Sequence, residues 1–353
     1  MKIAVAGCGW SGVLLANSLS VNHEITVYEK SKELKAICSW AIPTLSFREL
    51  AKSYNLNADD YVKWVSKQLV MEKGKKTLNI PVTGLCTFDK FNFMKNIMGS
   101  TQATFHFGET LNPEEYSNYD LIVDATGYRA MLGKLSTDKY YSTYQVKAEF
   151  KDLPYPDFYI RFPAHEDLTA TKYLWVNPLS YNTAYVGCSS TNGKKAYNIV
   201  HKFIQETHAT VLEEQAKMLR LNPPQESRPF IYGKIVGVGN SIGAITSLGE
   251  GNQPSAATVK LLTQNLTNLP QYQKQVLKHL GWLKYDYKAY AALTQNKILS
   301  NITCMMRMQK IYYRRSRMKV NLQTLRKFFS NNENAKQNSE SNHEGSNMAS
   351  QAF

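Results

Sequence analysis

The chain has 353 residues, of which 43% are hydrophobic, and a net charge of +14, which fits a globular protein with two packed domains and an anionic partner. It contains no apolar run of about eighteen residues and no signal-peptide pattern, which excludes a transmembrane helix and leads us to expect a cytoplasmic protein. The five cysteines are scattered without metal-ligand spacing, so neither a metal site nor a disulfide framework is expected.

The first predicted elements alternate between strand and helix. Apolar residues at 3–6 predict a buried strand, residues 13–20 a helix, and the alternating pattern at 24–29 a second strand. We expect residues 45–73 to be largely helical, with a short strand-rich stretch and a helix near 91–98 after them.

The middle of the chain, residues 136–224, is rich in aromatic residues at strand-like spacing and predicts an antiparallel sheet. We expect a helix over 196–220 and another over 256–266, with helices dominating 270–330. The tail at 331–353 is rich in Asn, Ser and Glu and has almost no apolar content, so we expect it to be disordered.

Basic and apolar side chains are interleaved between residues 305 and 329. An amphipathic basic helix of this kind suits a peripheral membrane contact. Packing on the body of the protein, with the basic side in solvent, is the other interpretation. The segment has no recognisable nucleic-acid-binding module, so no nucleic-acid partner is expected.

The run Gly7-Cys8-Gly9-Trp10-Ser11-Gly12 lies between the first predicted strand and the first helix. Gly7 permits a tight turn, Gly9 lets the backbone approach a pyrophosphate, and Gly12 lets the helix pack near the strand. Glu29 ends the second strand, where a carboxylate accepts hydrogen bonds from a ribose. This context predicts a dinucleotide site.

Two later glycine clusters indicate FAD rather than NAD. Asp124-Ala125-Thr126-Gly127 follows the predicted strand 121–123 and resembles the A-T-G element of FAD-binding oxidoreductases. The segments 239–243 and 247–251 resemble the element that surrounds ribityl and flavin in the same group, with Asn240 in place of its usual Asp. A helix beginning after Gly251 would direct its N–H groups at the flavin.

Tyr173-Leu174-Trp175-Val176-Asn177-Pro178, with Gly187 nine residues beyond the proline, resembles the Y-x-W-x-F-P-x8-G signature of the archaeal-type geranylgeranyl reductase family. Asn177 replaces the Phe of that signature. Cys38 stands where the family carries a cysteine, although Ser39-Trp40 replaces the glycines that follow it. Lys90 stands where the family has a basic residue that contacts FAD.

This resemblance implies the following cofactor-binding residues: Gly7, Gly9, Ser11, Gly12, Glu29, Lys90, Ala125, Thr126, Gly127, Gly239, Asn240, Gly249, Gly251 and Asn252. The catalytic candidates are Cys38, Tyr173 and Trp175. Tyr173 and Trp175 are two residues apart, so they share a face of the sheet and could line an apolar tunnel. Cys38 and Tyr173 are candidate proton donors, and water is an alternative.

The expected fold is α/β, with a Rossmann-like FAD-binding domain that is interrupted by an antiparallel-sheet substrate domain, as in the p-hydroxybenzoate-hydroxylase-like group. The FAD domain would comprise residues 1–135 and 225–270, and the substrate domain 136–224. A helical region at 271–330 and the tail 331–353 complete the chain.

The resemblance implies an FAD-dependent reduction of the C=C bonds of geranylgeranyl chains in isoprenoid membrane lipids. The electron donor would visit transiently, as NAD(P)H or a ferredoxin-like carrier, because the sequence has no second dinucleotide motif. Two alternatives stay open: a flavin-dependent monooxygenase or halogenase of the same fold, and a degenerate flavin fold that serves as a membrane-surface binding protein.

Overall fold

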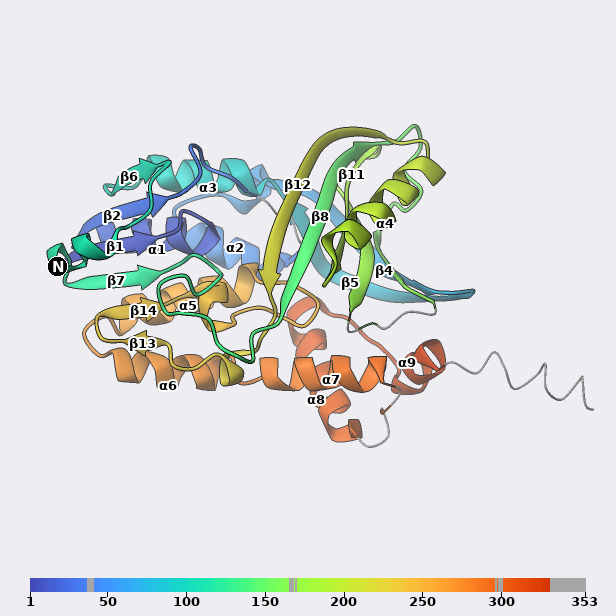
Figure 1. Ribbon diagram of the computed structural model, residues 1–353. Coiled ribbons are helices and arrows are strands. Elements are labelled where there is room, and N and C mark those ends of the chain that lie inside the picture. The colour runs from blue at the N-terminus through green and yellow to red at the C-terminus, as the bar shows by residue number, and fades with distance from the viewer. Residues whose placement is uncertain (37–40, 165–167, 169, 296, 298–300, 331–353) are drawn as a thin grey trace, which may run out of the picture.

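The computed structural model describes residues 1–36, 41–164, 168, 170–295, 297 and 301–330. Cys38 and the predicted disordered tail at 331–353 lie outside these residues. Within the described part the chain forms two sheets that lie at opposite ends of the molecule, with helices packed around them (Figure 1). The fold is α/β, as predicted.

The smaller, six-stranded sheet has the order β13-β14-β7-β1-β2-β6. Its strands are β1 (Lys2–Ala6), β2 (Glu24–Glu29), β6 (Thr104–Phe107), β7 (Leu121–Asp124), β13 (Ile231–Tyr232) and β14 (Ile235–Gly237). β1 lies in the middle and pairs in parallel with β2 and β7. The apolar side chains of β1 are buried on both faces: Ile3 and Val5 share a core with α1, and Ala4 packs on the other face with Leu111 and Ile122.

Helices α1 (Trp10–Ser20), α2 (Thr44–Ser53), α3 (Lys90–Gly99), α5 (Asn252–Gln264) and α6 (Leu269–His279) belong to this end of the molecule. α1 packs between α3 and α5, and its apolar residues share one core with those of β1 and β2. Short 3-10 helices occur at Ala58–Asp60, Pro113–Asn118, Pro224–Glu226 and Gly239–Ile242.

The larger, eight-stranded sheet has the order β12-β8-β11-β10-β9-β4-β5-β3. Its strands are β3 (Ile42–Pro43), β4 (Val62–Lys73), β5 (Lys76–Phe88), β8 (Tyr140–Glu149), β9 (Phe158–Phe162), β10 (Thr171–Pro178), β11 (Thr183–Ser190) and β12 (Thr210–Arg220). Helix α4 (Gly193–Glu206) covers one face of the β8–β11 region through a core of its own. The sheet thus takes strands β3 to β5 from the N-terminal part of the chain, and the predicted domain boundaries stay predictions.

The expected helix over 45–73 is wrong in its second half. α2 ends at Ser53, and β4 begins at Val62 and forms a hairpin with β5. Leu69 and Met71 are buried in the core beside the larger sheet and alternate with more exposed neighbours. This two-residue period is that of a strand.

The expected helix over 196–220 is also wrong in its second half, because α4 ends at Glu206 and β12 follows. The residues of β12 include the good helix formers Leu, Glu, Gln, Ala, Lys and Met. Pairing along the whole length of β8 overrides that preference, since it satisfies the backbone groups of both strands.

The C-terminal region is helical, as predicted, with α7 (Leu283–Thr294), α8 (Ile302–Ser316) and α9 (Leu322–Phe329), drawn in orange to red in Figure 1. The apolar residues Met305, Met308, Phe328 and Phe329 are buried against the rest of the protein. The basic segment therefore packs on the body of the protein with its apolar side. No helix among the described residues is long and apolar enough to cross a membrane.

Candidate functional site

A cavity of about 570 Å³ opens between the two sheets. One wall consists of the carboxyl ends of β1, β2 and β7, and the other of the face of the larger sheet that α4 leaves uncovered. All the predicted cofactor-binding residues except Gly12 and Gly239 line it. The volume falls within the range of about 300–1,000 Å³ that is usual for ligand sites.

The glycines of the first turn have different neighbours. Gly7 has a φ of +104°, in the left-handed region, and a Cβ there would lie 2.8 Å from the carbonyl oxygen of Ala125. A Cβ on Gly12 would lie 1.9 Å from the carbonyl oxygen of Gly7, so α1 reaches the turn only because Gly12 has no side chain. A Cβ on Gly9 would meet nothing within 4 Å, and the space beside it belongs to the cavity.

Glu29 is held in place at the mouth of this turn. Its carboxylate accepts hydrogen bonds from the backbone N–H groups of Cys8 and Ser31, both at 2.9 Å. Lys30 and Lys35 line the same part of the cavity. The arrangement combines a fixed acceptor for a ribose with positive charge for a diphosphate.

Asp124 organises the second motif. Its fully buried carboxylate accepts hydrogen bonds from the Thr126 hydroxyl at 2.7 Å, from the Ser241 hydroxyl at 2.9 Å and from the N–H groups of Met131 and Leu132. Asp124 therefore joins the loop after β7 to the glycine cluster near residue 240, and it brings Ala125, Thr126 and Gly127 to the cavity wall.

Gly239 lies behind the cavity and touches the first motif. A Cβ on Gly239 would lie 2.1 Å from the Ser11 hydroxyl oxygen, so a larger residue would push the two motifs apart. The next residue, Asn240, lines the cavity, and its buried Oδ1 has no hydrogen-bond partner.

The turn 246–252 forms the end of the cavity near the larger sheet. The Tyr173 hydroxyl donates to the Leu248 carbonyl oxygen, and Lys90 donates to Asn252 Oδ1 at 2.9 Å. α5 begins at Asn252, so the positive end of its dipole faces the cavity. The Ser247 hydroxyl and Asn252 Nδ2 are buried on this wall without partners.

These residues fit FAD. Buried polar atoms are almost always hydrogen-bonded, yet Asn240 Oδ1, the Ser247 hydroxyl and Asn252 Nδ2 are unsatisfied on the wall of one cavity. Asn240 Oδ1 can accept a hydrogen bond, the Ser247 hydroxyl can accept or donate one, and Asn252 Nδ2 can donate one. Together with the open backbone at Gly9, these groups match a polar ligand that runs from the first turn to the start of α5. Asn240 offers an acceptor in the place where the element that residues 239–251 resemble has Asp.

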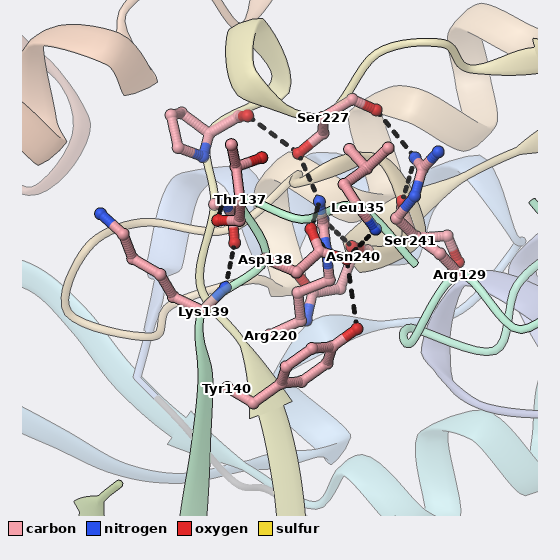
Figure 2. A network of polar contacts seen from close by, with 12 residues as sticks. Arg129, Leu135, Thr137, Asp138, Lys139, Tyr140, Arg220, Ser227, Asn240 and Ser241 are labelled. Atoms are coloured by element: carbon pink, nitrogen blue, oxygen red, sulfur yellow. Dashed lines mark hydrogen bonds and ion pairs between the residues drawn. The ribbon is translucent and has the colours of Figure 1, made fainter. Parts of the chain in front are cut away.

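A buried polar network joins the cavity to the larger sheet (Figure 2). Arg220, at the end of β12, donates through Nε to Asp138 at 2.7 Å and through Nη1 to the Asn240 carbonyl oxygen at 3.3 Å. Arg129 is fully buried and donates to the carbonyl oxygens of Ser227 at 2.8 Å and Ser241 at 3.1 Å. The network holds the backbone that carries Asn240.

The charges of this network affect each other's pKa. Burial by itself would raise the pKa of Asp138, but hydrogen bonds from Arg220 and the Leu135 N–H hold it below its usual value. Burial, and then the charge of Arg220, lowers the pKa of Arg129. Asp138 is therefore ionised at neutral pH and paired with Arg220, whose side chain is fully buried.

A second, smaller cavity of about 90 Å³ meets the first at Leu248, which lines both. Its apolar lining residues are Ala41, Pro43, Leu69, Leu85, Phe158, Ile160, Leu248 and Met318. Its polar lining residues are Asn177, Thr246, Glu250, Tyr312, Arg315 and Ser316. The uncovered face of the larger sheet thus has an apolar half beside the turn 246–252.

Residues of helix α8 line the small cavity and form hydrogen bonds with the turn 246–252. Arg315 donates to Glu250 Oε2 at 2.7 Å and to Gln253 Oε1, and its guanidinium carbon lies 4.4 Å from the centre of the Trp282 ring. The side chains of Arg315 and Glu250 are 13% and 14% exposed, so water screens this ion pair little.

Asp286 of α7 supports the turn from behind. It accepts hydrogen bonds from the Ser247 N–H at 2.5 Å and from the Tyr312 hydroxyl at 2.6 Å. Burial raises the pKa of Asp286, although these two hydrogen bonds favour its charged form. Residues of α7 and α8 therefore hold the segment that would contact a flavin ring.

The three catalytic candidates have different positions. Tyr173 lines the larger cavity, but Trp175 lines neither cavity and is 1% exposed. Trp175 pairs with Gly187 across β10 and β11, and a Cβ on Gly187 would lie 2.2 Å from the indole ring. The spacing in the signature therefore reflects packing of the Trp ring over a glycine, and of the two residues only Tyr173 lines a described cavity. Cys38 lies outside the described residues.

Another cysteine, Cys8, lines the larger cavity. Burial, and then the charge of Glu29, raises the pKa of its thiol to about 12, so the thiol is protonated at neutral pH.

Several residues of the site were not predicted. Trp10 donates its indole N–H to the Asn252 carbonyl oxygen at 2.8 Å, and Asp124, Ser247 and Arg315 act through the contacts described above. Asp124 could have been identified, because it ends a strand directly before the Ala-Thr-Gly element. No sequence signal identifies Arg315, which lies 65 positions from Glu250.

Comparison with known proteins supports the assignment of the fold. No family model matches the chain. An uncharacterised protein of Methanocaldococcus jannaschii is 23% identical over 335 residues, which is 84% of this chain and 90% of that protein. The solved structure of a geranylgeranyl bacteriochlorophyll reductase-like protein from Thermoplasma acidophilum has a TM-score of 0.64 at 14% identity, and the match covers 92% of this chain and 89% of that one.

Two further solved structures share the fold at 14% identity. A flavin-dependent halogenase from Xanthomonas campestris has a TM-score of 0.60, covering 83% of this chain and 77% of that one. A flavoprotein/dehydrogenase from Cytophaga hutchinsonii has a TM-score of 0.59, covering 84% and 87%. With its parallel sheet, its curled mixed sheet and the cavity between them, the chain has the fold of the FAD-dependent oxidoreductases of the p-hydroxybenzoate-hydroxylase-like group.

Proposed function

We propose that this protein binds FAD and reduces C=C bonds of an isoprenoid chain, such as the geranylgeranyl chain of a membrane lipid. The observation that carries the proposal is the apolar cavity that meets the cofactor cavity at Leu248. The resemblance of residues 173–187 to the geranylgeranyl reductase signature, and the similarity in fold to a reductase-like protein of that kind, agree with it.

Each part of the larger cavity has a role in this proposal. Glu29 would accept the ribose hydroxyls, Gly9 and the N-terminus of α1 would hold the pyrophosphate, and Asn240 would bind the ribityl chain. Ser247 and Asn252 would hold the ring system. When bound, FAD would supply the hydride; the chain supplies binding, orientation and exclusion of water.

The small cavity would hold the reacting end of the substrate. Leu69, Phe158 and Ile160 give it an apolar wall, which retains a hydrocarbon and excludes water. Because a volume of about 90 Å³ holds only a few carbon atoms, the remainder of a long chain would lie outside the described cavity.

The proposed partners are a transient electron donor, either NAD(P)H or a ferredoxin-like carrier, and a membrane surface. Arg307, Arg314 and Arg317 of the C-terminal region are exposed. Their positive charge would attract an acidic carrier or anionic lipid headgroups.

The proposal is tested by purifying the protein without added cofactor and recording its visible spectrum before and after anaerobic reduction with dithionite. We expect flavin bands that bleach on reduction and return faster with a geranylgeranyl lipid than without it. A colourless protein that added FAD does not reconstitute would contradict the proposal and favour a binding protein with a degenerate flavin fold. Oxygen consumption coupled to substrate turnover would instead favour the monooxygenase or halogenase alternative.

A further inference from the structure

The small apolar cavity contains one unusual polar group, the side chain of Asn177. This residue is on β10, is 3% exposed and lines the cavity beside Leu248. Its amide nitrogen, Nδ2, is buried and has no hydrogen-bond partner. Around it the cavity wall includes Leu69, Leu85 and Phe158, none of which has a polar side-chain atom.

The other polar side chains of this wall already have partners. Arg315 is bonded to Glu250, the Tyr312 hydroxyl donates to Asp286, and the Ser316 hydroxyl donates to the Tyr312 carbonyl oxygen. These groups therefore have less hydrogen-bonding capacity to spare for a ligand than Asn177 Nδ2.

An unsatisfied amide in such a place destabilises the folded protein. An apolar residue of similar size would avoid this cost, and the signature that residues 173–187 resemble has Phe at this position. A buried polar group without a partner, on a residue that lines a cavity, indicates a ligand atom that completes its hydrogen bonds.

We infer that Asn177 donates a hydrogen bond to an oxygen atom of the substrate, and that this oxygen is a carbonyl conjugated with the double bond to be reduced. The inference rests on the proposed reduction of a C=C bond in an isoprenoid chain, and it favours a chain with a conjugated carbonyl over the isolated double bonds of a membrane lipid. The substrate is an apolar chain with an α,β-unsaturated aldehyde or ketone at its reacting end.

The chemistry of reduction explains why a donor is useful there. An isolated alkene has no group that stabilises negative charge. In a conjugated carbonyl compound, hydride that a bound, reduced flavin would supply would bond to the β-carbon, and the electron pair of the C=C bond would move to the carbonyl oxygen. A hydrogen bond from Nδ2 stabilises that oxygen, and a proton from water in the larger cavity, which meets the small one at Leu248, then bonds to the α-carbon. The flavin is oxidised and the double bond is reduced.

The test measures binding to the FAD-loaded protein by isothermal titration calorimetry with three matched probes: citronellal (an aldehyde), citronellol (the alcohol) and citronellene (a hydrocarbon without oxygen). We expect the wild-type protein to bind citronellal most tightly. Asn177→Leu should weaken citronellal binding about tenfold, the value of one hydrogen bond in an apolar site, and leave citronellene binding unchanged or tighter.

A second measurement follows the reoxidation of the dithionite-reduced flavin by citral, the conjugated aldehyde. Asn177→Leu should slow it at least about tenfold. Asn177→Val also lacks the donor, suits a position in a β-strand and should behave likewise, which keeps the test valid if the Leu variant is unstable. Equal affinity of Asn177→Leu and wild type for citronellal, or tighter binding of citronellol than citronellal by the wild type, would overturn the inference.

Failure of the inference and failure of the proposed function have different signatures. If the protein holds no flavin, the proposed function fails. If it holds flavin and reduces isolated double bonds with no effect of the Asn177 variants, the proposed function holds and the inference fails. FAD affinity should be the same in wild type and variants, because Asn177 does not line the cofactor cavity.

Discussion

At the scale of single residues, the first turn shows how three glycines serve separate purposes. Position 12 requires a glycine, because a Cβ there would lie only 1.9 Å from the Gly7 carbonyl oxygen. Gly9 has no such neighbour among the described residues, so nothing in that part of the protein requires a glycine there. A requirement at Gly9 can come only from a ligand that approaches the backbone.

This difference predicts opposite effects of two matched substitutions. Gly9→Ser keeps a good residue at the N-cap of α1, so the free energy of unfolding of the apoprotein should change by no more than about 0.5 kcal/mol, while FAD affinity should fall at least about tenfold. Gly12→Ser should destabilise the apoprotein by about 1–3 kcal/mol or more, because the turn must move. Urea unfolding and flavin fluorescence titration measure the two quantities. Undiminished FAD affinity in Gly9→Ser would show that no pyrophosphate approaches this turn.

At the scale of secondary-structure elements, the turn 246–252 depends on helices far along the chain. α8 reaches it through Arg315 and Glu250, and α7 through Asp286 and the Ser247 N–H. A loop rich in glycine has high conformational freedom, and these contacts restrict it before a ligand binds.

Removal of a side chain of α7 or α8 that holds this turn should therefore weaken FAD binding, even if that side chain does not touch FAD. Arg315→Met leaves the Glu250 carboxylate nearly buried and unpaired, and we expect FAD affinity to fall about tenfold. Arg314→Met is the matched control, because Arg314 is exposed, and it should bind FAD as the wild type does. The double variant Arg315→Met/Glu250→Gln should recover part of the loss. Equal flavin fluorescence titrations for both single variants would contradict this role of α8.

At the scale of the whole molecule, the two sheets are joined where β8 begins and β12 ends. There Asp138 and Arg220 form an ion pair with side chains 1% and 0% exposed, and Arg220 also holds the Asn240 carbonyl oxygen (Figure 2). The pair therefore fixes the larger sheet relative to the cofactor cavity.

Asp138→Asn should lower the free energy of unfolding at neutral pH by about 3 kcal/mol, since Arg220 stays buried without its counter-ion. The folded-state pKa of Asp138 lies below its usual value, so its ionisation stabilises the protein above about pH 4, and this stabilisation is lost as the pH falls through the folded-state pKa. The difference between wild type and variant should thus shrink in acid. Urea unfolding over a pH series measures it, and a difference that is independent of pH would disprove the role of the charge.

Much of the cofactor cavity could be predicted because its motifs are local. Gly7, Glu29 and the Ala-Thr-Gly element each follow a strand directly, and strands of a parallel sheet bring their carboxyl ends to one edge. Gly12 and Gly239, which are among the predicted cofactor-binding residues, do not line the larger cavity and pack behind its wall, and spacing alone does not distinguish the two positions.

The sequence by itself determined the glycine-rich turn after the first strand, the order of strands and helices around it and the helical C-terminal region, because turn chemistry and apolar periodicity act over a few residues. Only the tertiary structure decided that residues 210–220 form an edge strand, that Trp175 covers Gly187 and that Arg315 meets Glu250. These outcomes depend on partners distant in the sequence, whose pairing and burial outweigh local preference.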